Sequence, residues 1–229
     1  MAKTSKNILG DQRGKIGKVV GRVVEGVQMF SAAPGPRGSN GTQRQKEHRA
    51  RFAAVVHMGK PMKGAINIGM KLSASKKRMQ TPFNLFVNHN LKHTIYDGST
   101  GLAEPVYEAI ELSEGDIPPV TFSTPSFAEP LKATVTFSGN ADAPGALEED
   151  TVYAVAYCPT LLQRAMGTAV RFAESVTINM PSTWRGKEIH LWGFVRTSVS
   201  IPMEIEEYGI VLLPDACSSS SYIGTGEVS

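Results

Sequence analysis

Two stretches of alternating side chains decide the fold: Lys132-Ala133-Thr134-Val135-Thr136-Phe137 and Val152-Tyr153-Ala154-Val155-Ala156-Tyr157. β-Branched and aromatic residues recur in both at a period close to two, as in a strand that buries one face. Segments of similar character surround them at residues 106–112, 120–123, 169–172, 175–180, 189–198 and 209–213. Clusters of Pro, Gly, Asn and Ser separate these segments, so the second half of the chain reads as consecutive short strands.

Seven or eight short strands within about 110 residues favour a β-sandwich of immunoglobulin-like type. The Cys…Trp…Cys spacing of antibody domains is absent, so the sandwich is expected to lack a disulfide. Cys158 lies in an apolar strand and is expected to be buried, whereas Cys217 lies in a polar, serine-rich tail and is expected to be exposed. The basic N-terminus has no apolar core after it, which predicts a chain that stays in the cytoplasm with free thiols.

The first hundred residues follow a different pattern. Residues 1–13 read as a basic arm, and residues 14–33 predict a β-hairpin that turns at Glu25-Gly26. A Pro- and Gly-rich linker follows, and Thr42 is a good N-cap for a helix over residues 43–58, which Pro61 should end or kink. Further helices are expected over 62–72 and from Thr81-Pro82. The predicted fold class is therefore α+β: an N-terminal β-hairpin and helices, then the immunoglobulin-like β-sandwich.

Charge is divided unequally along the chain. Residues 1–100 hold 18 Lys and Arg against 4 Asp and Glu, whereas residues 101–229 hold 6 against 17, for a total net charge of +3. This division predicts two domains: a basic N-terminal module at 1–100 and an acidic β-sandwich at 101–229 with a polar C-terminal tail. The basic module should seek an anionic partner.

The basic residues are the candidate partner-binding site. They are Lys15, Lys18, Arg22, Arg44, Lys46, Arg49, Arg51, Lys76, Lys77 and Arg78. No helix-turn-helix, zinc-finger or RNA-recognition motif accompanies them, so any nucleic-acid binding would be directed at the backbone and tolerant of sequence. A solvated basic face is the alternative interpretation.

The sequence carries no motif for catalysis. No Gly-x-Ser-x-Gly elbow is present, and the glycine-rich segment 14–21 lacks the Ser or Thr that follows the lysine of a phosphate-binding loop. We therefore predict no enzyme, no catalytic residue and no cofactor. A pocket with converging ionisable groups would favour an enzyme instead.

No metal site is predicted either. His89 and His93 are four residues apart on an expected helix, but position 90 is Asn, so the glutamate of the zinc-protease motif is missing. The two histidines are interpreted as part of a polar helix face. The acidic run Glu148-Glu149-Asp150 is interpreted as a solvated loop.

Five segments give the chain a family resemblance. They are Gly14-Lys15-Ile16-Gly17-Lys18-Val19-Val20-Gly21, residues 42–52, Ile66-Asn67-Ile68-Gly69-Met70, Thr81-Pro82-Phe83-Asn84 and residues 181–190. In this order the chain resembles an uncharacterised Bacteroidota family of domains of unknown function, found also in phage-related regions. The resemblance covers nearly the whole chain. It implies the architecture above and brings no established activity.

These observations predict a non-enzymatic structural or assembly protein, a phage virion or virion-like component that oligomerises through its basic N-terminal module. Its expected partners are further copies of itself or other assembly proteins. The alternative is a sequence-tolerant nucleic-acid-binding protein that uses the basic half. Neither a membrane nor a small-molecule substrate is expected. The chain is expected in the cytoplasm when synthesised and in the virion if a phage encodes it.

Overall fold

The structure is a computed structural model of the 229-residue chain, and it divides into two compact units, Met1–Thr42 and Gln43–Ser229. The boundary between the basic and acidic parts of the sequence, at residue 100, therefore lies inside the second compact unit. Charge and compactness divide the chain at different positions. The structure describes residues 2–4, 13–24, 27–35, 41–76, 81–138, 140, 142–197, 201–205, 209–213 and 216–229. For residues 2–4, 76, 201–205 and 209–213 it describes the backbone alone. Most of the predicted basic arm and the turn at Glu25-Gly26 lie outside these residues.

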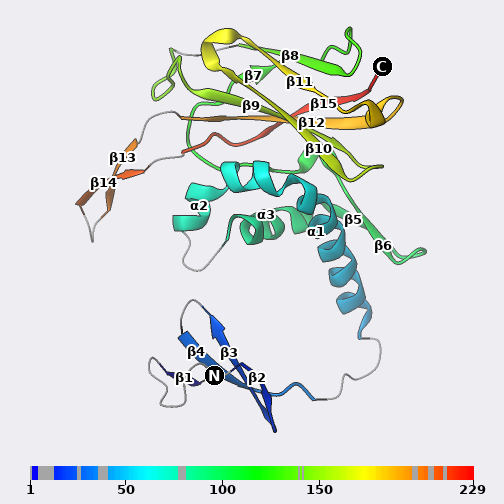
Figure 1. Cartoon of the computed structure of the whole chain (residues 1–229), viewed down its shortest axis with the longest axis vertical. Helices are drawn as coiled ribbons and strands as arrows, with labels where there is room; N and C mark the ends of the chain where they lie inside the picture. The colour runs from blue at the N-terminus through cyan, green and yellow to red at the C-terminus, as the bar shows by residue number, and fades with distance from the viewer. Residues whose placement is uncertain are drawn as a thin grey trace. The chain divides into compact units, whose positions relative to one another are not determined.

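The N-terminal unit is a four-stranded antiparallel sheet in the order β1-β4-β3-β2. Its strands are β1 (Ala2–Thr4), β2 (Gly14–Ile16), β3 (Val19–Val24) and β4 (Val27–Ala32), drawn in blue in Figure 1. The predicted hairpin over residues 14–33 contains an additional turn, because Gly17 and Lys18 form a tight turn that divides its first strand into β2 and β3. Gly17 has φ +58°, a conformation that glycine adopts without the steric cost that a Cβ would bring.

Three helices open the second unit: α1 (Gln43–Gly69), α2 (Lys71–Lys76) and α3 (Pro82–Asn90). Pro61 was predicted to end or kink the first helix. It does not end it, since α1 continues through Pro61, and Figure 1 shows the helix changing direction along its length. A proline inside a helix costs about 3 kcal/mol or more. Met58 and Met62 are buried on either side of Pro61 and anchor both halves to the same core. The predicted start of α3 is confirmed, because the Thr81 hydroxyl accepts a hydrogen bond from the Asn84 N–H at 3.2 Å.

A short hairpin follows the helices, made of β5 (Thr94–Asp97) and β6 (Leu102–Pro105). The predicted strand at 106–112 is wrong, because the chain there forms the 3₁₀ turn η2 (Tyr107–Ala109) and then an irregular segment. Apolar Ile110 and Leu112 are buried without strand pairing. The alternation of apolar residues at 106–112 therefore reflects the burial of these side chains and not their pairing in a sheet.

Two antiparallel sheets form the sandwich. One has the order β11-β8-β7 and the other β10-β9-β12-β15. Their strands are β7 (Thr121–Phe122), β8 (Lys132–Ser138), β9 (Thr151–Cys158), β10 (Gln163–Val170), β11 (Ser175–Asn179), β12 (Glu188–Arg196) and β15 (Ser221–Glu227). The chain passes between the sheets after β8, β10 and β11, which gives an immunoglobulin-like sandwich of three and four strands. The α+β prediction is thereby confirmed.

The four-stranded sheet is buried on both faces, so the second unit has three layers, as Figure 1 shows. Ala154, Ala156 and Leu191 face the core between the two sheets, whereas Val155 and Trp192 face the core under the helices. This explains why every residue of β9 after Thr151 is buried. Among the described helices, none has a stretch long and apolar enough to cross a bilayer.

The C-terminal segment is part of the fold and is not a tail, contrary to prediction. β15 pairs directly with β12. In the chain, the segment that joins these two strands contains a further hairpin, made of β13 (Ile201–Ile205) and β14 (Gly209–Leu213). Serine hydroxyls take the place of apolar side chains here: Ser218 Oγ accepts from the Val195 N–H at 2.9 Å, and Ser220 Oγ accepts from the Leu112 N–H at 2.8 Å. Ser218 can therefore be fully buried and Ser220 half-buried, because each hydroxyl satisfies a backbone group.

The two cysteines form no disulfide with each other, and both are buried. The prediction for Cys158 is confirmed, and the prediction that Cys217 is exposed is wrong. The Cys217 Sγ lies 3.5 Å from the carbonyl oxygen of Ile68 on α1, so the segment that contains it packs between the sandwich and the helices.

Candidate functional site

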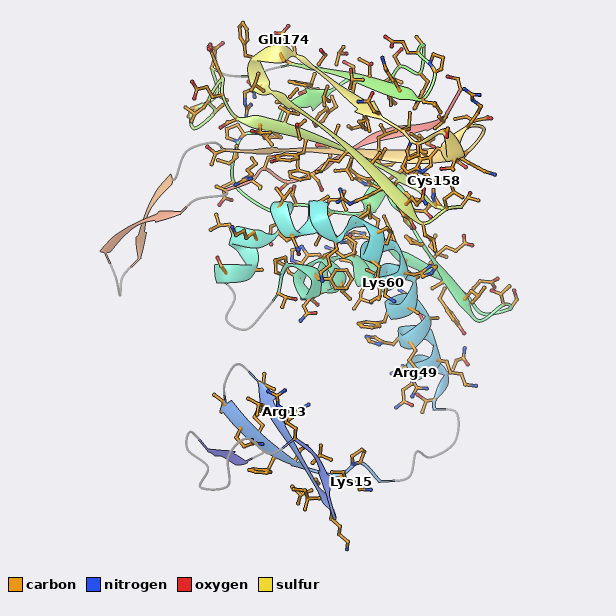
Figure 2. The ribbon with its side chains drawn as sticks, in the orientation of Figure 1. Arg13, Lys15, Arg49, Lys60, Cys158 and Glu174 are labelled. Carbon is orange, nitrogen blue, oxygen red and sulfur yellow. The ribbon has the colours of Figure 1, made fainter. Side chains whose placement is uncertain are left out.

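The predicted basic residues fall on both compact units. Lys15, Lys18 and Arg22 lie exposed on the N-terminal sheet, as Figure 2 shows for Lys15. Arg44, Lys46, Arg49 and Arg51 lie in the first turns of α1; the first three are exposed, and Arg51 pairs with Glu47 at 2.7 Å. Lys76 ends α2, and Lys77 and Arg78 lie outside the described residues. The role of these residues as a partner-binding surface stays a prediction.

The two histidines of the α3 region meet an acidic segment. His89 Nδ1 lies 3.3 Å from Glu111 Oε2, and His93 Nε2 lies 3.9 Å from Glu111 Oε1. Glu114 is also within 3.7 Å of His89 Nε2. No group of three or more metal-ligating side chains with the geometry of a metal site occurs in the part of the chain that the structure describes. The cluster therefore joins α3 to the irregular segment that follows η2.

The acidic run at 148–150 divides into two environments. Glu148 and Glu149 are exposed, as predicted, but Asp150 is completely buried. Its Oδ2 lies 3.2 Å from Nη2 of Arg171, which is also completely buried, and accepts a hydrogen bond from the Leu147 N–H at 3.0 Å. Asp150 is thus a structural residue, since a buried carboxylate needs a charged partner and hydrogen bonds.

The described surface also contains a groove that the sequence did not predict. It has a volume of about 480 Å³ and lies where the β5–β6 hairpin, η2 and β12 meet. Its lining combines apolar, acidic and aromatic side chains and contains no lysine or arginine: Ile95, Asp97, Thr100, Leu102, Glu104, Pro105, Val106, Tyr107, Glu108 and His190.

Stacked rings form one wall of the groove. The ring of Tyr107 stacks on the imidazole of His190, with centroids 3.9 Å apart and planes 19° apart. His190 Nδ1 lies 2.9 Å from the Tyr222 hydroxyl on β15, and the Trp192 indole N–H donates to the backbone carbonyl of Tyr107 at 3.2 Å. These contacts fix the Tyr107 ring at the surface, with the buried aromatic cluster behind it.

Burial and nearby carboxylates shift the pKa values in this wall. Burial lowers the pKa of His190, while Glu188 and Glu108 oppose the shift by favouring the imidazolium. Burial, then Glu104 and Glu188, raise the pKa of Tyr107, so its hydroxyl keeps its proton. Asp97 is fully exposed, and hydrogen bonds from the side chain and backbone of Ser99 and from Thr100 lower its pKa to about 2. The ring wall is therefore neutral at neutral pH, next to a fixed negative charge at Asp97.

Sequence reasoning missed this groove because its parts are distant along the chain. Tyr107 and His190 are separated by 83 positions, and Tyr222 belongs to a segment that the sequence describes as a polar tail. The sequence offered one local indication of the groove: Glu104 and Glu108 lie close to apolar and aromatic residues in the chain.

The fold and the groove together define the class of protein: an α+β chain with an immunoglobulin-like sandwich, a helical layer and an acidic, aromatic-walled groove. The chain belongs to a family that is described as "Family of unknown function (DUF6266)", whose model matches residues 11–201. The resemblance to an uncharacterised family is thereby confirmed. No curated protein and no solved structure matches the chain.

Proposed function

We propose that this protein is a non-enzymatic structural or assembly protein that oligomerises through its basic N-terminal unit, as a phage virion component made in the cytoplasm. One observation carries the proposal: among the described residues of the N-terminal unit, no apolar side chain larger than glycine is fully buried. A small sheet is marginal in stability unless apolar side chains are buried against it. A partner surface that covers it would supply the missing burial.

Charge supports the same proposal. Residues 1–42 hold seven Lys and Arg against two Asp and Glu, whereas residues 101–229 carry a net charge of −11. Opposite charges at the N-terminal unit and along residues 101–229 favour head-to-tail contact between copies, because such a contact brings unlike charges together. A contact of this kind closes into a ring or continues as a filament.

The groove supports a binding role over catalysis. Five ionisable side chains line the groove, Asp97, Glu104, Tyr107, Glu108 and His190, and converging ionisable groups are the feature that would favour an enzyme. Here the histidine is stacked under a tyrosine and has a lowered pKa, and no serine, cysteine or lysine lines the groove. The groove therefore offers neutral rings and carboxylates, which suit recognition of a cation.

Sedimentation velocity on the full chain tests the proposal, at several protein concentrations and at about 50 mM and 500 mM salt. We expect species larger than the monomer, with association weakened at high salt because charge pairs between surfaces are screened. Lys15→Glu/Lys18→Glu should weaken the association. The control Lys60→Glu/Lys63→Glu, on α1, should leave it unchanged. A monomer under every condition overturns the proposal.

A specific observation favours a second candidate function, sequence-tolerant nucleic-acid binding. Arg44, Lys46 and Arg49 are exposed in the first two turns of α1, and Lys60 and Lys63 line a hollow of about 400 Å³ beside the start of α3. Figure 2 labels Arg49 and Lys60 along this helix. Five phosphate contacts would give a log–log salt slope of about −4.5 on duplex DNA.

Binding of labelled duplex DNA at increasing salt tests this candidate. Lys60→Glu/Lys63→Glu should make the salt slope shallower by about 1.8, because two phosphate contacts are lost. No measurable binding near 50 mM salt removes it. The first proposal predicts that this variant still self-associates normally. The same set of variants therefore distinguishes the two proposed functions.

A further inference from the structure

The β5–β6 hairpin presents a mixed apolar and acidic face to the groove. Ile95 is paired with Glu104 and Asp97 with Leu102, and side chains two residues apart share a face, so all four lie on the same face. All four line the groove. Ile95 is 67% exposed and Leu102 is 66% exposed, which is unusual for neighbouring large aliphatic side chains in one small hairpin.

The wall of the groove provides a second, independent sign of a ligand. His190 is about nine-tenths buried and lines the groove. Its Nδ1 is held by the Tyr222 hydroxyl, and its Nε2 makes no hydrogen bond to any residue that the structure describes. Beside it, the Tyr107 ring forms part of the lining. A neutral ring next to carboxylates attracts an ammonium or guanidinium group that lies over its face.

The β2–β3 hairpin of the N-terminal unit has the complementary composition. Ile16 and Val19 are register partners and share a face, and they are 59% and 42% exposed. Exposed Lys15 precedes this pair, and exposed Lys18 occupies the turn between the two strands. The tip of this hairpin therefore offers two exposed aliphatic side chains on one face and two exposed cations, Lys18 at the turn and Lys15 on the neighbouring face. The groove offers two exposed aliphatic side chains among carboxylates.

We propose that the groove at β5–β6, η2 and β12 receives the tip of the β2–β3 hairpin of a second copy of this chain. Lysine ammonium groups of the tip lie against Tyr107 and the carboxylates of Glu104 and Glu108, and the aliphatic pair covers Ile95 and Leu102. This inference rests on the proposed self-assembly and names the surfaces that make it. The contact joins two different surfaces, so each copy keeps one free tip and one free groove for the next.

Charge reversal at the groove tests the inference in the full chain. Glu104→Lys/Glu108→Lys changes two exposed side chains, so folding should persist; tryptophan fluorescence and circular dichroism check that it does. We expect self-association to weaken at least about tenfold. The matched control Glu148→Lys/Glu149→Lys makes the same change of charge on an exposed loop and should weaken it less than about twofold.

An exchange of charges makes the test specific. Lys15→Glu/Lys18→Glu should weaken association as strongly as the groove variant does. Combining all four substitutions in one chain should restore most of it, because the charges of both surfaces are then reversed. Restoration supports the paired surfaces, and failure to restore overturns them.

The remaining outcomes separate this inference from the proposed function. If the unaltered chain does not associate, the proposed function fails and the inference fails with it. If the unaltered chain associates and the groove variant associates equally well, only the inference is overturned. If the groove variant associates normally but no longer binds a hexalysine peptide that the unaltered chain binds, the groove serves a different basic partner and the second copy is refuted.

Discussion

The buried pair of Asp150 and Arg171 should dominate the stability of the sandwich. Both side chains are completely buried, and Nη2 of Arg171 also donates to the backbone carbonyl of Pro118 at 2.9 Å. Arg171→Met removes the guanidinium and leaves the Asp150 carboxylate buried with only the Leu147 N–H as a partner among the described residues. Breaking a buried pair in this way costs about 3–5 kcal/mol. That is a large part of the roughly 5–15 kcal/mol that holds a domain folded.

An exposed ion pair in the same unit provides the control. Lys132 Nζ lies 2.6 Å from Glu129 Oε2, closer than the atoms of the buried pair, but the two side chains are 44% and 65% exposed. Exposed pairs contribute little to stability, since water solvates both charges when the pair is broken. Lys132→Met should therefore cost far less than Arg171→Met, and burial, not distance, should decide the ranking.

Urea unfolding of the full chain, followed by tryptophan fluorescence, measures both costs. Trp184 and Trp192 are the two tryptophans of the chain and are fully buried in the second unit, so the signal reports on the sandwich. The double variant Asp150→Asn/Arg171→Met removes both charges and should be more stable than the sum of the single losses implies. A loss below about 1 kcal/mol for Arg171→Met, or additive losses in the double variant, would refute the reasoning.

Three further predictions concern single residues. Gly193→Ala places a Cβ against the ring of Phe122, and overpacking of this kind should cost about 1–3 kcal/mol in the same urea assay; an unchanged midpoint contradicts it. Thr81→Ala removes the N-cap of α3 and should cost about 1 kcal/mol, whereas Thr81→Ser should cost much less. Burial lowers the pKa of His190, so the folded state takes up a proton less readily than the unfolded state, and stability should fall as the pH drops below about 6.5. His190→Gln should flatten this part of the stability profile, and the exposed-site control His57→Gln should not; equal effects of the two would count against burial as the cause.

Local pattern was sufficient for several elements. The strand at Lys132–Ser138 follows from alternation, since a sheet that buries one face needs an apolar residue at every second position. The strand at Thr151–Cys158 follows from its continuous apolar run, which suits a strand that is buried on both faces. The start of α3 follows from Thr81-Pro82, because the N-cap hydrogen bond is made within four residues. These features depend on neighbours in the chain, so the sequence reveals them.

Other elements depended on partners far along the chain. Strand β15 contains two glycines and has no apolar alternation, yet it pairs with Glu188–Gly193 of β12. α1 continues through Pro61 because buried methionines on both sides of it pack in one core. The stability that this packing provides cannot be read from a local sequence pattern. Propensity is a weak predictor where tertiary packing outweighs it.

The sequence alone determined the α+β class, the family resemblance and the opposite charges of the two halves, because these depend on composition and on local order. Only the tertiary structure decided that Asp150 is buried against Arg171, that Cys217 is enclosed, and that Tyr107 and His190 form the wall of a groove. Such sites combine residues that are 21 to 149 positions apart in the chain. Their environment is set by the packing of whole sheets and helices, and that packing is the physical reason the sequence could not reveal them.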